Sequence, residues 1–118
     1  MVNIRRLKFS LKNALQGLRH TLFFHQNLRI HVAVAALVII LGWSFAISPI
    51  EWAVIAAAIF FVLVAEMVNT SIEEVIDLVK IEHRQQSRIA KDVAAGMVLL
   101  AATFALVIGL IVFLPYLK

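Results

Sequence analysis

The feature that most constrains the fold is a set of three long apolar runs without a charged residue, at 32–47, 52–65 and 93–114. A helix needs roughly 20 predominantly apolar residues to cross a bilayer, so each run can span once its flanks are included. The chain is 63% hydrophobic over 118 residues, and a monomer of that size has too much surface to bury so much apolar area in water. The runs therefore predict an all-α integral membrane protein.

The predicted membrane-spanning helices each combine an apolar run with its flanks, at about 28–47, 49–66 continuing to 79, and 91–114. Ser48-Pro49 predicts the turn between the first two, because proline suits the first position of a helix. Trp43 and Trp52 stand on either side of this turn, as aromatic residues do at a membrane interface. Nothing resembles a linker or an internal repeat, so we expect a single domain over 1–118.

A basic amphipathic helix is predicted before the first span, at about 4–24. Its apolar residues recur every three or four positions and share one face: Ile4, Leu7, Leu11, Leu15, Leu18 and Leu22. Such a helix lies well at a membrane surface, with its cations near anionic headgroups. A partner-binding helix of the calmodulin-target kind and a targeting arm share this pattern. The membrane-spanning runs that follow at once favour the surface helix.

The distribution of Lys and Arg predicts the orientation. Residues 1–31 hold six of these cations, the turn at 48–51 none, residues 80–91 four and the C-terminus one. Cytoplasmic loops carry the excess of Lys and Arg, so we expect a cytoplasmic N-terminus and a cytoplasmic second loop. This bias accounts for the formal net charge of +4 without a nucleic-acid partner. Cysteine is absent, which excludes a disulfide framework and thiolate metal sites.

Six of the seven acidic residues gather between Glu66 and Asp92. Four polar positions of the second span lie within a stripe about 80° wide on one helix face: Glu66, Asn69, Glu73 and Asp77. Glu66 directly follows the apolar run, and an ionisable group at a membrane boundary indicates function. For Glu74 and Glu82 we favour solvated charges, or partners of the cations of the second loop, over a role in function.

This stripe suits phosphoryl transfer to a lipid alcohol. Oxygen ligands without cysteine fit Mg2+ bound together with substrate phosphates, and a carboxylate near the lipid boundary can accept a proton from a lipid hydroxyl. Lys91 can balance phosphate charge. No GxxxxGKS/T loop is present, so a nucleotide would be held without a P-loop. An ion or proton carrier is a weaker alternative, because the acids lie at one end of the helix rather than midway.

Three segments resemble the prokaryotic diacylglycerol kinase family. Residues 66–77 follow its signature E-x-x-N-S/T-S/A-x-E-x-x-V/I-D, Ala90-Lys91-Asp92 follows at the family's spacing, and Asn27-Leu28-Arg29-Ile30-His31 matches its N-terminal part. Ile50-Glu51-Trp52 and residues 109–115 are most similar to the Gram-positive branch, whose members are mostly undecaprenol kinases. The resemblance covers nearly the whole chain.

The resemblance implies an ATP- and Mg2+-dependent lipid kinase, a homotrimer in the bacterial plasma membrane with its active site on the cytoplasmic side. It implies these roles: Glu66 as general base, Glu73 as magnesium ligand, Lys91, Asp92, Glu82, Arg6 and Asn13 as nucleotide-binding residues, and Asn69 and Asp77 as supporting residues. The expected reaction converts undecaprenol to undecaprenyl phosphate. Phosphorylation of diacylglycerol to phosphatidic acid and a non-catalytic relative of the family stay open as alternatives.

One departure from the family concerns metal binding. His25 stands where the family usually carries a second metal-binding glutamate, four residues before Arg29. Imidazole favours zinc and other transition metals over magnesium. His25 is therefore a candidate metal ligand, while a weakened or lost second magnesium site, or a surface histidine without a metal role, are alternatives. A second departure is His83-Arg84 in place of Tyr-His. We interpret His20 and His31 as interface or packing residues.

Overall fold

The protein is a bundle of long helices. The computed structural model describes residues 1–79 and 84–118. Its helices are α1 (Ile4–Phe24), α2 (Gln26–Phe45), α3 (Pro49–Leu78), α4 (Gln85–Phe113) and the short 3-10 helix η1 (Leu114–Leu117). Three helical stretches are long and apolar enough to cross a membrane: Gln26–Phe45, Pro49–Leu78 and Gln85–Leu117. The predicted all-α fold with three candidate spans is confirmed.

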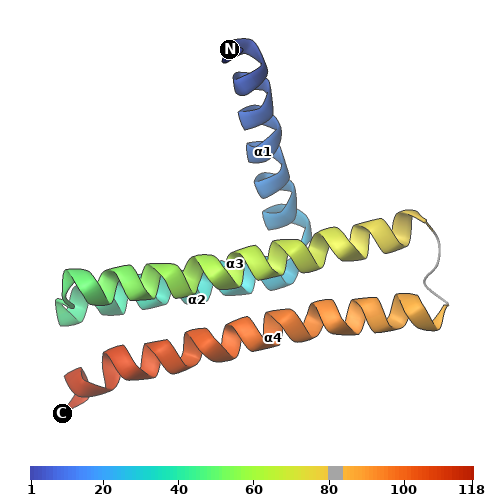
Figure 1. The fold of residues 1–118 in the computed structure, drawn as a ribbon. Helices are drawn as coiled ribbons and strands as arrows, with labels where there is room; N and C mark the ends of the chain where they lie inside the picture. Colours follow the sequence, from blue (N-terminus) through green and yellow to red (C-terminus); the bar gives the residue numbers. More distant parts are fainter. Residues whose placement is uncertain (80–83) are drawn as a thin grey trace.

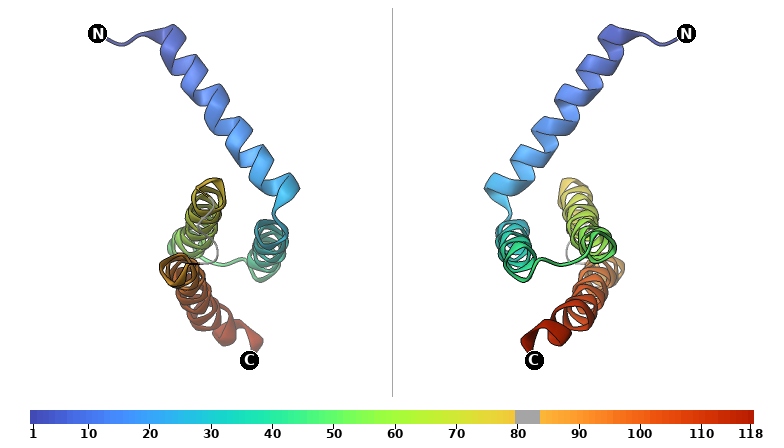
Figure 2. Two further views of the ribbon diagram at one scale, coloured as in Figure 1. Left: turned by 90° about the vertical axis from the view of Figure 1, so that its right-hand side faces the viewer. Right: turned by 90° about the vertical axis from the view of Figure 1, so that its left-hand side faces the viewer.

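Helix α3 is the central element. It packs against α4 along its length, and it also contacts α2. In Figure 1 these three helices run beside one another, whereas α1 leaves the bundle at a steep angle. The end-on views of Figure 2 show the N-terminal part of α1 projecting away from the other helices. The second span thus has neighbours on two sides, which allows its polar face to be buried.

The turn between α2 and α3 is built as the sequence predicts. Ser48 caps α3, since its hydroxyl accepts a hydrogen bond from the Glu51 N–H at 3.2 Å and the Glu51 carboxylate accepts from the Ser48 N–H at 3.0 Å. Pro49 occupies the first turn, where its missing N–H costs no hydrogen bond. Ala46 closes α2 in the left-handed conformation, with φ 53°.

Two apolar clusters hold the bundle together. One lies at the turn end, where buried Ile47, Ile55 and Val112 pack with surrounding aromatic rings. The other lies midway and joins Val62 and Ala65 of α3 to Ala101 of α4. Small residues at the second cluster let the two helix backbones approach closely. The part of α3 next to the α2–α3 turn and its middle part are therefore fixed against α4 by apolar packing.

Helix α1 is attached to the bundle mainly at its C-terminal end. Thr21 is its one buried residue. Arg29 of α2 donates hydrogen bonds to the carbonyl oxygens of Leu22 (3.2 Å) and Phe23 (2.5 Å), and so satisfies the last turn of α1. The apolar side chains of α1 are exposed in the isolated chain. Its location at the membrane surface stays a prediction.

Candidate active site

Among the acidic residues that the structure describes, Glu66 is the most deeply buried. It is 2% exposed, and its Oε2 atom has no hydrogen-bond partner among the described residues. At a rise of about 1.5 Å per residue, Glu66 lies roughly 25 Å along α3 from Pro49, close to the thickness of a hydrocarbon core of about 30 Å. If Pro49 starts at one face of the bilayer, Glu66 therefore approaches the other face.

The next two turns of α3 continue this polar row. The Asn69 side chain is 7% exposed, and its amide nitrogen donates to Oε1 of the half-buried Glu73 at 3.4 Å. The amide oxygen Oδ1 of Asn69 is buried without a partner among the described residues. Thr70, beside the row, is also buried. Asn69 thus orients the Glu73 carboxylate, while buried oxygens on Glu66 and Asn69 stay available to a ligand.

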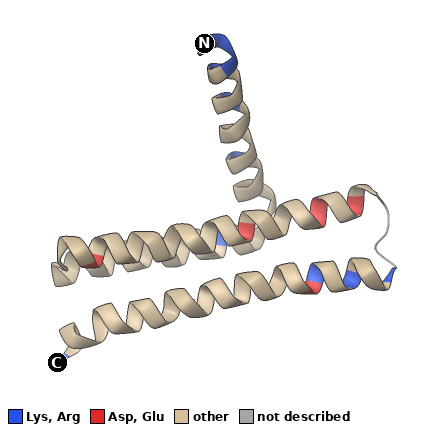
Figure 3. Cartoon of the chain, viewed as in Figure 1, with Lys and Arg blue, Asp and Glu red and all other residues tan. Residues whose placement is uncertain are grey.

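One ion pair of the site joins α3 to α4. Lys91 Nζ lies 3.2 Å from Oδ1 of Asp77, with side-chain exposures of 35% and 58%. Figure 3 shows that the acids of α3, except the one near the α2–α3 turn, share one half of the bundle with the cations at the start of α4. The structure therefore brings Asp77 and Lys91, both singled out by sequence, into direct contact at the end of the polar row.

His25 lies beside a carboxylate of α3 to which the resemblance gives no role. It separates α1 from α2, and its Nε2 lies 3.7 Å from Oε1 of Glu74, not from Glu73. Within the described ranges, 1–79 and 84–118, no ion pair joins His25 to Glu73. The sequence favoured a solvated or loop-paired charge for Glu74, because it does not show that His25, from a distant segment, lies beside this carboxylate.

The remaining predicted nucleotide-binding residues are not gathered around this row within one chain. Arg6 and Asn13 lie on the exposed, projecting part of α1, and Asp92 is exposed on α4. Glu82 lies outside the described residues. Ser87, which sequence reasoning did not single out, is 2% exposed and its Oγ has no partner among the described residues. Its position one helical turn before Lys91 is the signal that could have identified it.

The donor atoms of the row fit a hard divalent cation. Its buried unpaired oxygens, on Glu66 and Asn69, lie on the same helix face as the Glu73 carboxylate. Mg2+ prefers such oxygen ligands and usually combines one or two carboxylates with water and substrate phosphates. The side chains that would hold it are therefore Glu73 and a neighbouring oxygen of the row.

An apolar groove of about 560 Å³ runs between α2, α3 and α4. Its wall extends from His31 on α2 past Val62 on α3 to Phe113 on α4. Gly109 of α4 lines this groove, whereas Ala101 of the same helix is 1% exposed and packs against α3. The groove thus offers apolar surface that a single chain leaves uncovered.

These features define a class: a helical membrane protein with a buried acid partway along its central candidate membrane-spanning helix. The chain matches the prokaryotic diacylglycerol kinase family over residues 12–113. It is 36% identical over 112 residues to an undecaprenol kinase of Bacillus subtilis. This alignment covers 95% of this chain and 91% of the Bacillus protein. It is also 36% identical over 110 residues to a diacylglycerol kinase of Synechocystis, covering 92% of this chain and 63% of that protein.

The chain therefore belongs to the prokaryotic diacylglycerol kinase family. It is a lipid kinase, as the resemblance of residues 66–77 to the family signature predicts.

Proposed function

We propose that this kinase transfers the γ-phosphate of ATP to the hydroxyl group of undecaprenol and so makes undecaprenyl phosphate. Two relatives of equal identity support different acceptors, but the undecaprenol kinase aligns over 91% of its length and the diacylglycerol kinase over 63%. The apolar groove of about 560 Å³ supports a long hydrocarbon acceptor. Diacylglycerol, the acceptor in the name of the second relative, is the second candidate.

The buried Glu66 carboxylate carries this proposal. A carboxyl group that is 2% exposed and has one oxygen without a partner among the described residues lowers stability. A role in the reaction would explain why the chain keeps it there. A general base must lie where the acceptor hydroxyl can enter. Glu66 meets this condition, because it ends the uncharged stretch of α3 at the boundary that a lipid hydroxyl occupies. In our proposal its Oε2 accepts the proton of that hydroxyl.

We assign the rest of the row to the phosphates. Glu73, oriented by Asn69, holds Mg2+, which supplies neutralisation of the triphosphate charge when bound. Lys91 and Asp92 bind the nucleotide, with Glu82 as a further candidate, and Asp77 positions the Lys91 ammonium through their ion pair. Side chains of opposite charge at 3.2 Å hold each other in place even where the pair adds little stability.

We further propose a homotrimer in the bacterial plasma membrane, with the N-terminus and the active site on the cytoplasmic side. The excess of Lys and Arg in residues 1–31 and 80–91 supports this orientation. The assembly is supported by α1, which carries Arg6 and Asn13 and whose N-terminal part projects away from the other helices (Figure 2). In our proposal a neighbouring copy supplies these two residues to the site.

The acceptor assay tests the proposed reaction. The protein in detergent–lipid micelles receives labelled ATP with undecaprenol or with diacylglycerol, with and without Mg2+. We expect magnesium-dependent labelling of undecaprenol at the higher rate, and loss of transfer in Glu66→Gln by a factor of roughly 10²–10⁴. Faster labelling of diacylglycerol would reverse the acceptor assignment. A folded protein that labels neither lipid would indicate a non-catalytic relative.

Mixing two inactive variants tests the shared site. Glu66→Gln and Arg6→Ala are co-expressed in equal amounts, so that each trimer combines both kinds of chain at random. If each site takes Glu66 from one copy and Arg6 from its neighbour in a cyclic trimer, about a quarter of the sites are intact. Activity near a quarter of wild type supports the proposal. Activity no higher than that of the separate variants places both residues in one chain's site.

A further inference from the structure

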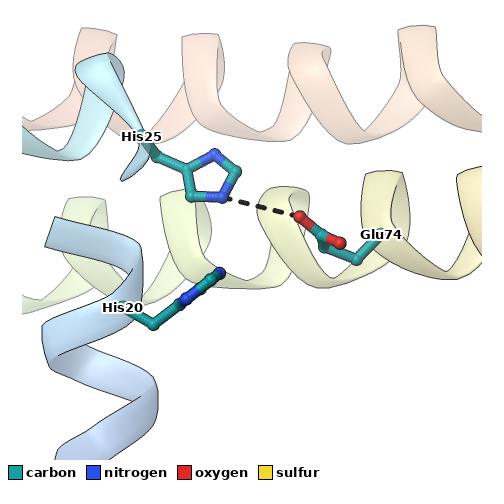
Figure 4. A group of neighbouring side chains, drawn as sticks. All are labelled: His20, His25 and Glu74. Atoms are coloured by element: carbon teal, nitrogen blue, oxygen red, sulfur yellow. Dashed lines mark ion pairs between the residues drawn. The ribbon is translucent and has the colours of Figure 1, made fainter. Parts of the chain in front are cut away.

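A second group of metal-ligating side chains lies outside the acid row. One ligand atom from each of His20, His25 and Glu74 lies within 4.8 Å of the others. Figure 4 shows the two imidazole rings and the carboxylate turned toward one another, from α1, from the α1–α2 junction and from α3. Two elements far apart in the sequence therefore meet at this point through side chains that can all coordinate one ion.

The distances require only small adjustments for coordination. Zinc bonds of about 2.0–2.1 Å in a tetrahedron place neighbouring ligand atoms roughly 3.3 Å apart. His25 Nε2 and Glu74 Oε1 are already 3.7 Å apart. His20 and Glu74 are exposed, so their side chains can rotate to close the remaining gap. The Phe24 ring packs beside the His20 ring, with centroids 4.8 Å apart.

The ligand types select the metal. Two imidazoles and one carboxylate form a set that zinc accepts, with the fourth position open to water. Magnesium prefers oxygen donors and near-octahedral geometry, so it fits the Glu66–Glu73 row better than this cluster. The two groups of ligands therefore differ in the ion they favour, although Glu73 and Glu74 are adjacent in the chain.

We propose that His20, His25 and Glu74 form a binding site for zinc or a similar transition-metal ion, and that the bound ion holds the C-terminal end of α1 against α3. Apolar packing contributes little to holding α1 against the bundle, because Thr21 is the one buried residue of α1. The Arg29 hydrogen bonds join the end of α1 to α2. A metal bridge adds a stronger connection to α3 than the His25–Glu74 ion pair at 3.7 Å.

Binding of Co2+ or Zn2+ alone tests the site, without nucleotide or lipid, so the result is independent of the kinase reaction. The full chain in detergent micelles is titrated with Co2+, whose visible absorption rises strongly in tetrahedral nitrogen and oxygen coordination, and then with Zn2+ in competition. We expect one ion per chain, and a loss of affinity of at least tenfold in His20→Ala, His25→Ala and Glu74→Gln.

Two controls separate this site from the rest of the molecule. His31→Ala removes a histidine outside the cluster, and Glu73→Gln alters the acid row; both should retain the wild-type affinity for Co2+. Circular dichroism verifies that each variant is folded. Absence of the Co2+ band, a band that survives His20→Ala and His25→Ala, or a loss in Glu73→Gln as large as in Glu74→Gln would overturn the proposal.

A spin label on α1 tests the proposed bridge. The chain has no cysteine, so Ser10→Cys offers a single labelling position. Zn2+ should reduce the mobility of the label in this background. The effect should disappear when His25→Ala is added. Equal mobility with and without Zn2+ in a protein that binds the ion would show that the ion does not hold α1.

Discussion

Replacing Glu66 by methionine should stabilise the fold while it abolishes the reaction. Glu66 is 2% exposed and its Oε2 has no partner among the described residues. Leaving a buried polar group unsatisfied costs about 1–3 kcal/mol. Methionine has a similar length and no polar atom of this kind, and its flexible side chain adapts to the space. We therefore expect Glu66→Met to raise the free energy of unfolding by about 1–3 kcal/mol.

Thermal unfolding in detergent micelles measures this effect. For a chain of about this size, 1 kcal/mol corresponds to roughly 4 °C in Tm, so the expected rise is about 4–12 °C. Phosphoryl transfer measured on the same preparation should fall by about 10²–10⁴. Asp92→Asn is the matched control for stability: it removes an exposed carboxylate, so Tm should change by the equivalent of about 0.5 kcal/mol or less.

Two results would refute the reasoning. A lower Tm in Glu66→Met would mean that Oε2 has a partner in the assembled protein, and that the carboxylate contributes to stability. Retained transfer in a stable Glu66→Met protein would remove Glu66 as the base. Tm and the rate of phosphoryl transfer are measured on the same sample, so a loss of transfer can be compared directly with the stability of that sample.

Four further substitutions test the packing and the nucleotide site. Ala46→Gly should raise Tm by the equivalent of about 1 kcal/mol, because φ 53° at Ala46 is costly for a residue with a Cβ. Gly42→Val should lower stability by about 1–3 kcal/mol, since a Cβ there would lie 2.6 Å from the Trp52 ring, whereas Gly96→Ala, with nothing within 4 Å, should not lower it. Lys91→Met should raise the KM for ATP by about 10–100-fold, because the substitution removes a hydrogen bond from a charged group. Its Tm should change by less than about 4 °C, because the Lys91–Asp77 ion pair is partly exposed.

Features that depend on one helix could be predicted from the sequence. The apolar runs indicated the three candidate spans, because length and hydropathy alone decide whether a helix can cross a bilayer. Ser48-Pro49 indicated the start of α3, because capping uses residues within one turn. The burial of Glu66 and Asn69 on one face follows from the helical period.

Features that depend on two helices could not be predicted in the same way. The His25–Glu74 pair depends on the angle between α1 and the bundle (Figure 1), and the periodicity of the sequence does not predict this angle. His20 looked like a packing residue for the same reason, since its neighbour on α3 lies far along the chain. The Asp77–Lys91 contact depends on the register of α3 against α4. The sequence singled out Lys91 as a cation that can balance phosphate charge, but it did not identify Lys91 as the partner of Asp77.

The two ends of the bundle are held together by different interactions, and this difference fits the place of the active site that we propose. At the turn end, the capping box, the apolar cluster around Ile55 and a hydrogen bond from Tyr116 to Glu51 join α2, α3 and α4. Beyond Glu66, the ion pairs from α3 to other elements are partly exposed ones, Asp77–Lys91 and His25–Glu74, within the part of the chain that the structure describes. Exposed ion pairs contribute little stability and exchange readily with other charges. A nucleotide or metal ion can therefore displace them without disturbing the apolar packing that positions Glu66.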